Sequence, residues 1–501
     1  MLSVFLRVLR RLRRDERGVV LILFVLLFFP LMLVVAVVID FSQTLVVKRQ
    51  LTAAVDSAAL ALGTLPSLDD DEAEGKAEDY IRANYPDSSI GRLTGFAVTR
   101  EDDTIDVSAS AEVDTTFMRI AGYDTLTVTV NNRVMRKQNR LEVVMALDNT
   151  GSMGGSKMAA LKDSANVLVD ALFGDKTESD AVRIGLVPFA GAVNVGAALR
   201  GAAWLDEANP SALNHEQIDD DTDDTFRSLF EIFDALELPW HGCVRARAEP
   251  YELTDDPPVA GNADTLFTPY FAPDEMENNS NNYISGDAQK KKKVKHYKNK
   301  KGAITADAPN YRCPANRTVQ PLTNVKSTIT SAIADMSADG HTVIPEGMAW
   351  AWRLISSNAP FTTGAPYTDQ DTIKVIILLT DGENWIEAPG NGEYKSLYTA
   401  FGHAADGHLG TTDGLQAHQM LNQKTTEVCT NIKADKDGDA SDEDIIVYTI
   451  AFGVGGGSTV ETLMRDCASD VGKFYNSPNA TDLQATFESI AIGLNKLRVA
   501  Y

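Results

Sequence analysis

The chain has 501 residues, with 70 Asp or Glu against 46 Lys or Arg, which gives a formal net charge of -24 at pH 7. The length suggests two or three domains with a sizeable core, and the acidic balance argues against nucleic acid as a partner. None of the four cysteines forms a CxxC pair, which disfavours a structural zinc site.

The N-terminus joins a basic tail to a long apolar segment. Six arginines lie in residues 1–18, and residues 19–39 carry no charged side chain. This apolar length matches the hydrocarbon thickness of a bilayer, and arginines before it are typical of the cytoplasmic side. We therefore predict a cytoplasmic basic tail over 1–18 and an uncleaved, single-pass transmembrane helix over 19–39, with the rest of the chain outside the cytoplasm. A cleaved secretory signal and a buried core helix are the alternatives.

Two smaller elements follow the apolar segment. Residues 40–65 repeat apolar side chains at helical spacing and are rich in alanine, so they predict a helical stem that continues the membrane helix. Residues 66–140 start with an acidic, turn-like stretch and then alternate Val, Ile and Thr with polar residues, which predicts a β-rich stalk module. An extension of the sheet of the following domain would produce the same alternation.

From residue 141 onward, continuous apolar runs alternate with segments of helical spacing. Such runs indicate parallel strands that are buried on both faces. The fold class that we predict for residues 141–498 is therefore α/β, with a doubly wound and mainly parallel sheet. The predicted strands lie in 141–148, 181–191, 372–382, 444–455 and 472–476.

Residues 196–325 interrupt this alternation. They contain an acidic run, Pro-rich and Asn-rich stretches, and the lysine-rich stretch Lys290–Lys301. Because a structureless loop of this length is unusual inside a compact domain, we predict a large insertion. We interpret the lysine-rich stretch as a solvated loop, with a contact to phosphate or to an acidic partner as the alternative.

The four cysteines are expected to pair, because the chain is predicted to lie outside the cytoplasm. Cys429 and Cys467 flank a single predicted strand, so we pair them by proximity, and Cys243 is left to pair with Cys313 and clamp the insertion. Four cysteines allow three connectivities, and the sequence does not exclude the other two.

Oxygen-bearing side chains gather where the first of these strands ends. The stretch LDNTGSMG places Asp148, Thr150 and Ser152 on alternate residues, and Gly151 lets the backbone turn tightly between them. Ligands of open α/β sheets bind beyond the carboxyl ends of the strands. A carboxylate with neutral hydroxyls suits Mg²⁺, followed by Mn²⁺. The alternative is an ordinary Asx-type turn that caps the next helix.

This motif resembles the metal-ion-dependent adhesion site of von Willebrand factor type A domains, with threonine at position 150 where that family usually has serine. The segments GHTVIPEGMAWAW (340–352) and LLTDGEN (378–384) are similar to two further parts of the site. The resemblance implies a von Willebrand factor A-like fold and a divalent ion, Mg²⁺ or else Mn²⁺ or Ca²⁺. It also implies that a carboxylate of a protein partner completes the coordination. The implied ligands are Asp148, Thr150, Ser152, Thr342 and Asp381.

The N-terminal region, residues 17–65, resembles TadG-like tight-adherence (Tad) pilus-assembly proteins. The matching features are the Arg17-Gly18 start, Pro30, the Asp40 exit and the segment KRQLTAAVDSAALA. This resemblance implies that the chain is anchored in the bacterial inner membrane, and that its partners are pilus-assembly or envelope proteins.

A second acidic stretch, residues 435–444, does not follow the calcium loop of an EF-hand. Ala440 stands where that loop has glycine, and Ile446 stands where it has its last acid. We expect an exposed acidic turn there rather than a calcium site.

Three functions are compatible with these patterns. We expect a membrane-anchored, metal-ion-dependent adhesion or assembly module that is not an enzyme and has no nucleic-acid or small-molecule partner. A structural envelope component with a functionally silent metal site is the first alternative. A periplasmic metal-dependent hydrolase is the second, and Glu383 is the only acid beside the aspartate loop that could act as its base.

Overall fold

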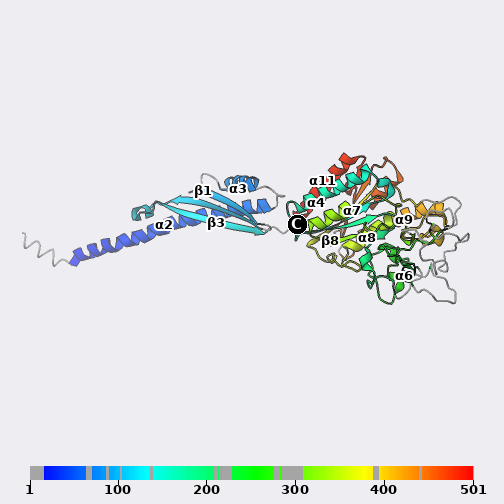
Figure 1. Ribbon diagram of the computed structural model, residues 1–501. Helices are drawn as coiled ribbons and strands as arrows, with labels where there is room; N and C mark the ends of the chain where they lie inside the picture. The colour runs from blue at the N-terminus through cyan, green and yellow to red at the C-terminus, as the bar shows by residue number, and fades with distance from the viewer. Residues whose placement is uncertain are drawn as a thin grey trace, which may run out of the picture. The chain divides into compact units, whose positions relative to one another are not determined.

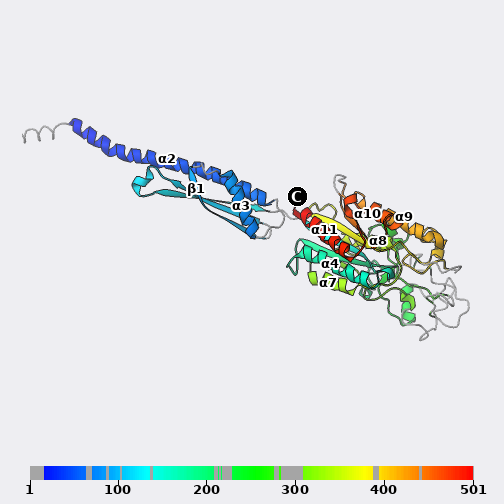
Figure 2. The same ribbon diagram turned by 90° about the horizontal axis from the view of Figure 1, so that it is seen from above.

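The computed structural model describes most of the chain, and these residues fall into two compact units. The N-terminal unit extends to Gln138, and the C-terminal unit runs from Asn139 to Arg498 (Figures 1 and 2). The lysine-rich stretch Lys290–Lys301 and the acidic run 218–224 lie outside the described residues. The described residues are 16–63, 70–85, 90–101, 104–135, 139–207, 213, 216, 228–275, 281, 283, 308–386, 394–438 and 443–499.

The N-terminal unit consists of a long helix, a shorter helix and a three-stranded antiparallel sheet. Its elements are α2 (Glu16–Gly63), α3 (Asp70–Asn84), β1 (Gly91–Glu101), β2 (Thr104–Asp114) and β3 (Thr125–Met135), in the sheet order β1-β2-β3. Side chains along β2 alternate between buried and half-buried positions, because the helices cover one face of the sheet. This one-sided burial explains the alternating sequence pattern.

Helix α2 changes its surroundings along its length. Between Phe24 and Phe41 most of its described large apolar side chains are exposed, whereas between Val47 and Leu62 one face is buried in the core of the unit. The stretch Leu26–Gly63 is long and apolar enough to cross a membrane, and it is the one such helix among the described residues. The N-terminal apolar helix expected from the sequence is thus confirmed, and it continues into the stem without a break.

The C-terminal unit is built on a mixed sheet with five parallel strands. In spatial order these are β11 (Phe474–Ser477), β10 (Ile446–Phe452), β9 (Thr372–Thr380), β4 (Arg140–Asp148) and β5 (Val182–Phe189). Short antiparallel strands extend the sheet on the β5 side, namely β6 (Val193–Asn194), β7 (Cys243–Val244) and β8 (Gln320–Thr323). The mixed α/β architecture with a parallel sheet, as predicted from the sequence, is confirmed.

Helices pack on both faces of this sheet. One face, which includes Val143 and Met145 of β4, packs against α4 (Ser156–Phe173), α7 (Lys326–Asp335) and α11 (Ala480–Val499). The other face, which includes Val144 and Ala146, packs against α8 (Ile344–Ile355), α9 (Gly414–Lys433) and α10 (Thr459–Cys467). Because successive side chains of a strand point to opposite faces, the apolar run of β4 from Val143 to Leu147 contributes to both layers of the core.

The described part of the insertion packs firmly onto the C-terminal unit. It contains α6 (Leu229–Ala235) and β7, and it contributes four buried rings to the core shared with α8, those of Phe230, Phe233, Phe267 and Phe271. Two disulfides are present, Cys243–Cys313 within the insertion and Cys429–Cys467 between α9 and α10. Strand pairing and buried aromatic rings therefore hold the insertion in addition to its disulfide.

Candidate metal centre

Asp148 is the last residue of β4 and lies fully buried between β5 and β9 at the carboxyl edge of the sheet. One oxygen of its carboxylate, Oδ1, accepts the backbone N–H of Thr150 at 2.8 Å. The other oxygen, Oδ2, accepts the hydroxyl of Thr380, the last residue of β9, at 2.6 Å. The loop after β4 and the last residue of β9 thus each hold one oxygen of this carboxylate.

Thr150 and Ser152 lie between Asp148 and Asp381 and connect the two carboxylates through hydrogen bonds. The hydroxyl oxygens of Thr150 and Ser152 lie 3.0 Å apart, and the Ser152 hydroxyl donates to Oδ1 of Asp381 at 2.5 Å. Asp381 follows β9 directly, and Ser152 belongs to the short 3-10 helix η2 (Gly151–Met153) that precedes α4. Four of the five residues expected as ligands therefore meet at one edge of the sheet.

Thr342, the fifth residue, lies in the loop before α8. Its backbone N–H donates to the carbonyl of Trp385 at 3.2 Å, and its own carbonyl accepts the Trp385 N–H at 2.9 Å. The same loop reaches the β4 motif, because the carbonyl of Gly340 accepts the N–H of Gly151 at 3.0 Å. Among the described residues, no hydrogen bond joins the Thr342 hydroxyl to the other four side chains.

Two residues that the sequence reasoning did not single out contact the same carboxylates. Thr380 holds Asp148, as described above, and Lys157 in the first turn of α4 places its Nζ 2.6 Å from Oδ2 of Asp381. The Asp381 side chain is fully buried, whereas that of Lys157 is 37% exposed. The sequence position of Lys157, five residues after Ser152, does not indicate this contact. Whether the side chain can reach Asp381 depends on the residue at which α4 begins.

The electrostatics of this edge favour a cation. Burial, and after it the charge of Asp381, raise the pKa of Asp148 to about 6, against the lowering effect of its hydrogen bonds to Thr150 and Thr380. Two carboxylates and two hydroxyls form a set of hard oxygen donors, which is the set that Mg²⁺ and Ca²⁺ prefer. The residues present therefore fit a divalent ion.

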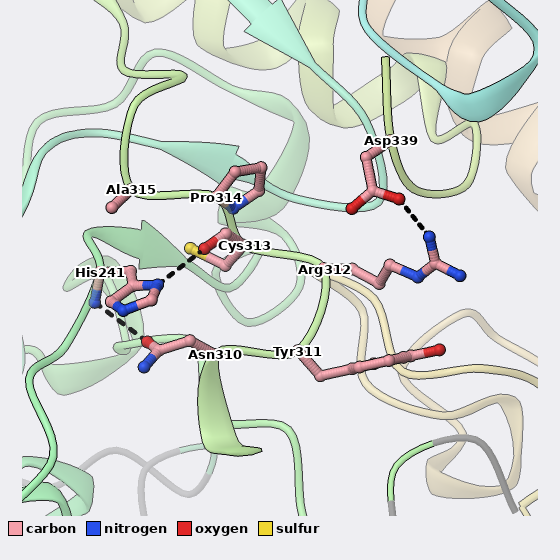
Figure 3. A pocket seen from close by; sticks show the side chains of 8 residues that line it. All are labelled: His241, Asn310, Tyr311, Arg312, Cys313, Pro314, Ala315 and Asp339. Atoms are coloured by element: carbon pink, nitrogen blue, oxygen red, sulfur yellow. Dashed lines mark hydrogen bonds and ion pairs between the residues drawn. The ribbon is translucent and has the colours of Figure 1, made fainter. Parts of the chain in front are cut away.

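A small pocket lies on the neighbouring part of the insertion (Figure 3). It has a volume of about 350 Å³ and is lined by residues around Cys313 and by Asp339. Figure 3 shows the Arg312 side chain extending to Asp339, with which it forms an ion pair, and the His241 ring next to the Cys313 carbonyl, at 3.0 Å from Nδ1. The backbone N–H of Asp339 donates to the carbonyl of Asn149 at 2.8 Å, so the pocket adjoins the β4 motif.

The second acidic stretch lies at the other edge of the sheet. Carboxylate oxygens of Asp435, Asp437 and Asp444 lie within 4.8 Å of one another. Asp444 comes just before the start of β10, whereas Asp148 ends β4, and these two strands run in the same direction. Asp435 is exposed, and the other two are partly exposed, as an acidic surface turn would be.

Comparison with known proteins gives one family match and several distant structural similarities. The family described as "Putative Flp pilus-assembly TadE/G-like" matches residues 18–63. No curated protein matches the chain.

The similar solved structures include pilus proteins. The vWF domain of the type V pili tip protein Mfa5 from Porphyromonas gingivalis is 12% identical with a TM-score of 0.32, and the match covers 72% of this chain and 97% of that one. The pilus adhesin SpaC from Lactobacillus rhamnosus GG is 10% identical with a TM-score of 0.33, over 82% of this chain and 35% of SpaC. Proximal thread matrix protein 1 from the mussel byssus, with a zinc occupied MIDAS motif, is 12% identical with a TM-score of 0.28, over 73% of this chain and 47% of that one.

Proposed function

We propose that this chain is a membrane-anchored, metal-ion-dependent protein-binding module, which acts in Tad-type (Flp) pilus assembly at the bacterial cell envelope and is not an enzyme. The TadE/G-like match over residues 18–63 supports the pilus context. The meeting of Asp148, Thr150, Ser152 and Asp381 at one strand edge is the observation that carries the metal-binding part.

The proposed ligand set consists of these four residues and Thr342. Asp148 is the anchor, because Thr150 and Thr380 already hold its carboxylate in place. Ser152 and Thr150 supply neutral oxygens, and Asp381 and Thr342 contribute directly or through water, as Mg²⁺ often keeps part of its water shell. When bound, the ion supplies a Lewis-acid position for a carboxylate oxygen of the partner protein. Mg²⁺ is the proposed ion, with Mn²⁺ and Ca²⁺ as alternatives.

The proposed architecture assigns this site to the C-terminal unit and the membrane anchor to the N-terminal unit. We assign a cytoplasmic tail to 1–18, a transmembrane helix to 19–39, a stem to 40–65 and a stalk module to 66–140. The remaining residues, 141–498, form a doubly wound von Willebrand factor A-like domain with an insertion at 196–325. The parallel strand order β11-β10-β9-β4-β5 with helices on both faces supports the last assignment.

One contact favours the alternative of a structural component with a silent site. Lys157 already neutralises Asp381 across 2.6 Å, so the protein has a cation of its own at this edge. For a hydrolase, the remaining alternative, the exposed Glu383 is the candidate base in the aspartate loop.

Calorimetric titration of the full-length protein in detergent with Mg²⁺, Mn²⁺ and Ca²⁺ tests the site. We expect the wild type to bind one divalent ion and Asp148→Asn to bind none. Asp435→Asn is the matched control, because it makes the same chemical change at the other edge of the sheet and should leave binding unchanged. If none of the three ions binds the wild type saturably, the metal site does not exist.

A pull-down from envelope extract then separates the two remaining functions. The adhesion or assembly function predicts that partners are recovered with Mg²⁺ but not with chelator, and not with Asp148→Asn under either condition. Equal recovery in all lanes, with metal binding intact in the wild type, would favour the structural function with a silent site. Partner loss for both Asp148→Asn and Asp435→Asn would show that the loss is not specific to the proposed metal site, and would contradict ion-mediated binding.

A further inference from the structure

We propose that the turn between β2 and β3 is a second membrane-contacting element, which rests in the lipid interface beside the apolar part of α2. The turn contains the short 3-10 helix η1 (Met118–Ala121). It lies next to α2 in both views of the ribbon (Figures 1 and 2). This inference rests on the proposed membrane span.

The turn exposes apolar side chains where a turn in water is normally polar. Phe117, Ile120 and Tyr123 are 39%, 78% and 58% exposed. Together with Met118 they form one wall of a groove of about 500 Å³, whose other wall is the part of α2 between Met32 and Ile39. A contiguous apolar surface of this kind marks a contact with another apolar phase.

The position of Asp40 sets the depth of the turn. Asp40 follows the apolar segment 19–39 directly, and its buried carboxylate accepts three consecutive backbone N–H groups at 2.7–3.0 Å, those of Thr116, Phe117 and Met118. A helix rises about 1.5 Å per residue, so the groove residues from Met32 onward lie within roughly 12 Å of Asp40. A span of about 30 Å that ends at Asp40 therefore places the turn at the edge of the hydrocarbon region.

Most backbone N–H groups of the turn are paired within the protein, which is the requirement that lipid imposes on polar groups. In hydrocarbon an unpaired N–H is costly, because no water is present to accept its hydrogen bond. Besides the three donors held by Asp40, four more N–H groups of the turn are paired with carbonyls of the same turn. These are Thr115 to Asp124, Ile120 to Phe117, Gly122 to Arg119, and Tyr123 to Met118.

One exposed ion pair on the turn limits how deeply it enters. Arg119 Nε lies 3.2 Å from Oδ1 of Asp124, and both side chains are largely exposed. An arginine stem can lie along apolar surface while its guanidinium reaches the lipid phosphates, and tyrosine is common at this level of membrane proteins. The pair places the turn at the headgroup level rather than near the bilayer centre.

Lipid is the occupant because the turn continues the surface of the span. Between Leu26 and Ile39 nearly every described side chain of α2 is exposed, on all sides of the helix. Lipid can surround a helix that is apolar on all sides, whereas a single partner protein would cover one side of it. The apolar side chains of the turn lie against this same helix surface, so the same lipid covers both.

Tryptophan fluorescence of the full-length protein in phosphatidylcholine vesicles tests the depth of the turn. Ile120→Trp replaces an exposed apolar residue with another one, and quenching by lipids brominated on their acyl chains reports contact with the bilayer. The five native tryptophans lie beyond residue 139, so the wild-type signal is subtracted. We expect at least a roughly twofold loss of the emission of the introduced tryptophan, as for an interfacial tryptophan.

Two matched variants on α2 make the outcome decisive. Phe28→Trp, near the middle of the apolar segment, should be quenched if the span exists, and Leu60→Trp, an exposed position 20 residues beyond Asp40, should not. If Phe28→Trp is quenched and Ile120→Trp behaves like Leu60→Trp, the inference about the turn is wrong while the span stands. If Phe28→Trp is not quenched, the span itself fails. A blue-shifted but unquenched Ile120→Trp would indicate a protein partner and would also overturn the inference.

Discussion

The two units of the chain each bury an aspartate next to a turn, but they surround it differently. Asp40 in the N-terminal unit accepts three backbone N–H groups, whereas Asp148 in the C-terminal unit accepts one backbone N–H and one hydroxyl and lies near the carboxylate of Asp381. At Asp40 burial acts to raise the pKa, but the three donors outweigh it and the pKa is lowered. At Asp148 burial and Asp381 prevail, and the pKa is raised to about 6.

This difference separates an acid that holds the fold from an acid that fits a ligand. The carboxylate of Asp40 has its charge balanced by backbone dipoles, so it needs nothing further. The pair of Asp148 and Asp381 concentrates negative charge at one strand edge, and a cation there lowers the free energy of the folded state. Burial of an aspartate therefore does not by itself indicate a metal site. A second carboxylate close to the buried one is a better indication that a cation would bind there.

The largest effect is expected from a third acid, which is buried and paired. Glu142 of β4 lies 2.7 Å from Nζ of the buried Lys374 and also pairs with Arg183. We expect Glu142→Gln to lower the free energy of unfolding of the C-terminal unit by about 3–5 kcal/mol, because Lys374 keeps its charge without a partner carboxylate. Urea unfolding followed by the native tryptophans, all in this unit, measures the change.

An exposed pair in the N-terminal unit is the control for this prediction. Asp106 and Arg133 form an ion pair at 2.8 Å across β2 and β3, with side chains 33% and 64% exposed. We expect Asp106→Asn to change stability by less than about 1 kcal/mol, measured by hydrogen exchange of β2, because water and salt screen the pair. Similar losses for the two variants would show that burial does not decide the strength of these pairs.

A smaller effect is expected at the proposed metal centre. Lys157 occupies one oxygen of Asp381, so a divalent ion must compete with its ammonium group. We expect Lys157→Met to raise the affinity for Mg²⁺ about fivefold, which corresponds to about 1 kcal/mol for a partly exposed pair. Isothermal titration calorimetry of the wild type and the variant measures this ratio.

Lys162→Met is the matched control for the competition. Lys162 lies on the same helix, but its Nζ donates to the carbonyl of Ala334 instead of to a carboxylate of the centre. Its replacement should leave the affinity for Mg²⁺ unchanged. Weaker binding in Lys157→Met would mean that the lysine supports the site rather than competing with the ion.

Sequence patterns carried information about local structure in both units. β2 is covered on one face, so its apolar and polar side chains alternate, whereas β4 is covered on both faces and its apolar run is continuous. Both patterns are typical of strands, so the sequence predicts both elements. Asp148, Thr150 and Ser152 are neighbours in the chain, so their clustering needs only one tight turn. Their role as ligands remains a prediction.

Contacts between residues that are distant in the sequence could not be predicted from local sequence patterns. The donors to Asp40 lie 76 to 78 residues further along the chain, and the sequence marked this residue only as the end of the apolar segment. Thr342 and Asp381 entered through a family resemblance, not through spacing. Lys157 reaches Asp381 because of the position where α4 starts, and side-chain reach of this kind is decided by packing in three dimensions.

The smallest and most local effect is expected at Asp40. Asp40→Asn keeps an oxygen acceptor but removes the charge, so we expect faster amide hydrogen exchange at Thr116, Phe117 and Met118 while the core amides of β2 stay protected. Asp56→Asn, on the same helix, is the control. Asp56 accepts a side-chain bond from Asn132, so its replacement should leave these three amides unchanged.

The pH dependence gives an independent check on the charge of Asp40. Because the pKa of Asp40 is lowered in the folded state, its contribution to stability is present above the unfolded-state pKa of about 3.9 and is lost as the pH falls through the folded-state pKa. The turn amides of the wild type should therefore lose protection at acidic pH, corrected for intrinsic exchange, whereas Asp40→Asn should show no such step. A step of equal size in both proteins would mean that another group holds the turn, and the contrast between the two buried aspartates would then rest on Asp148 alone.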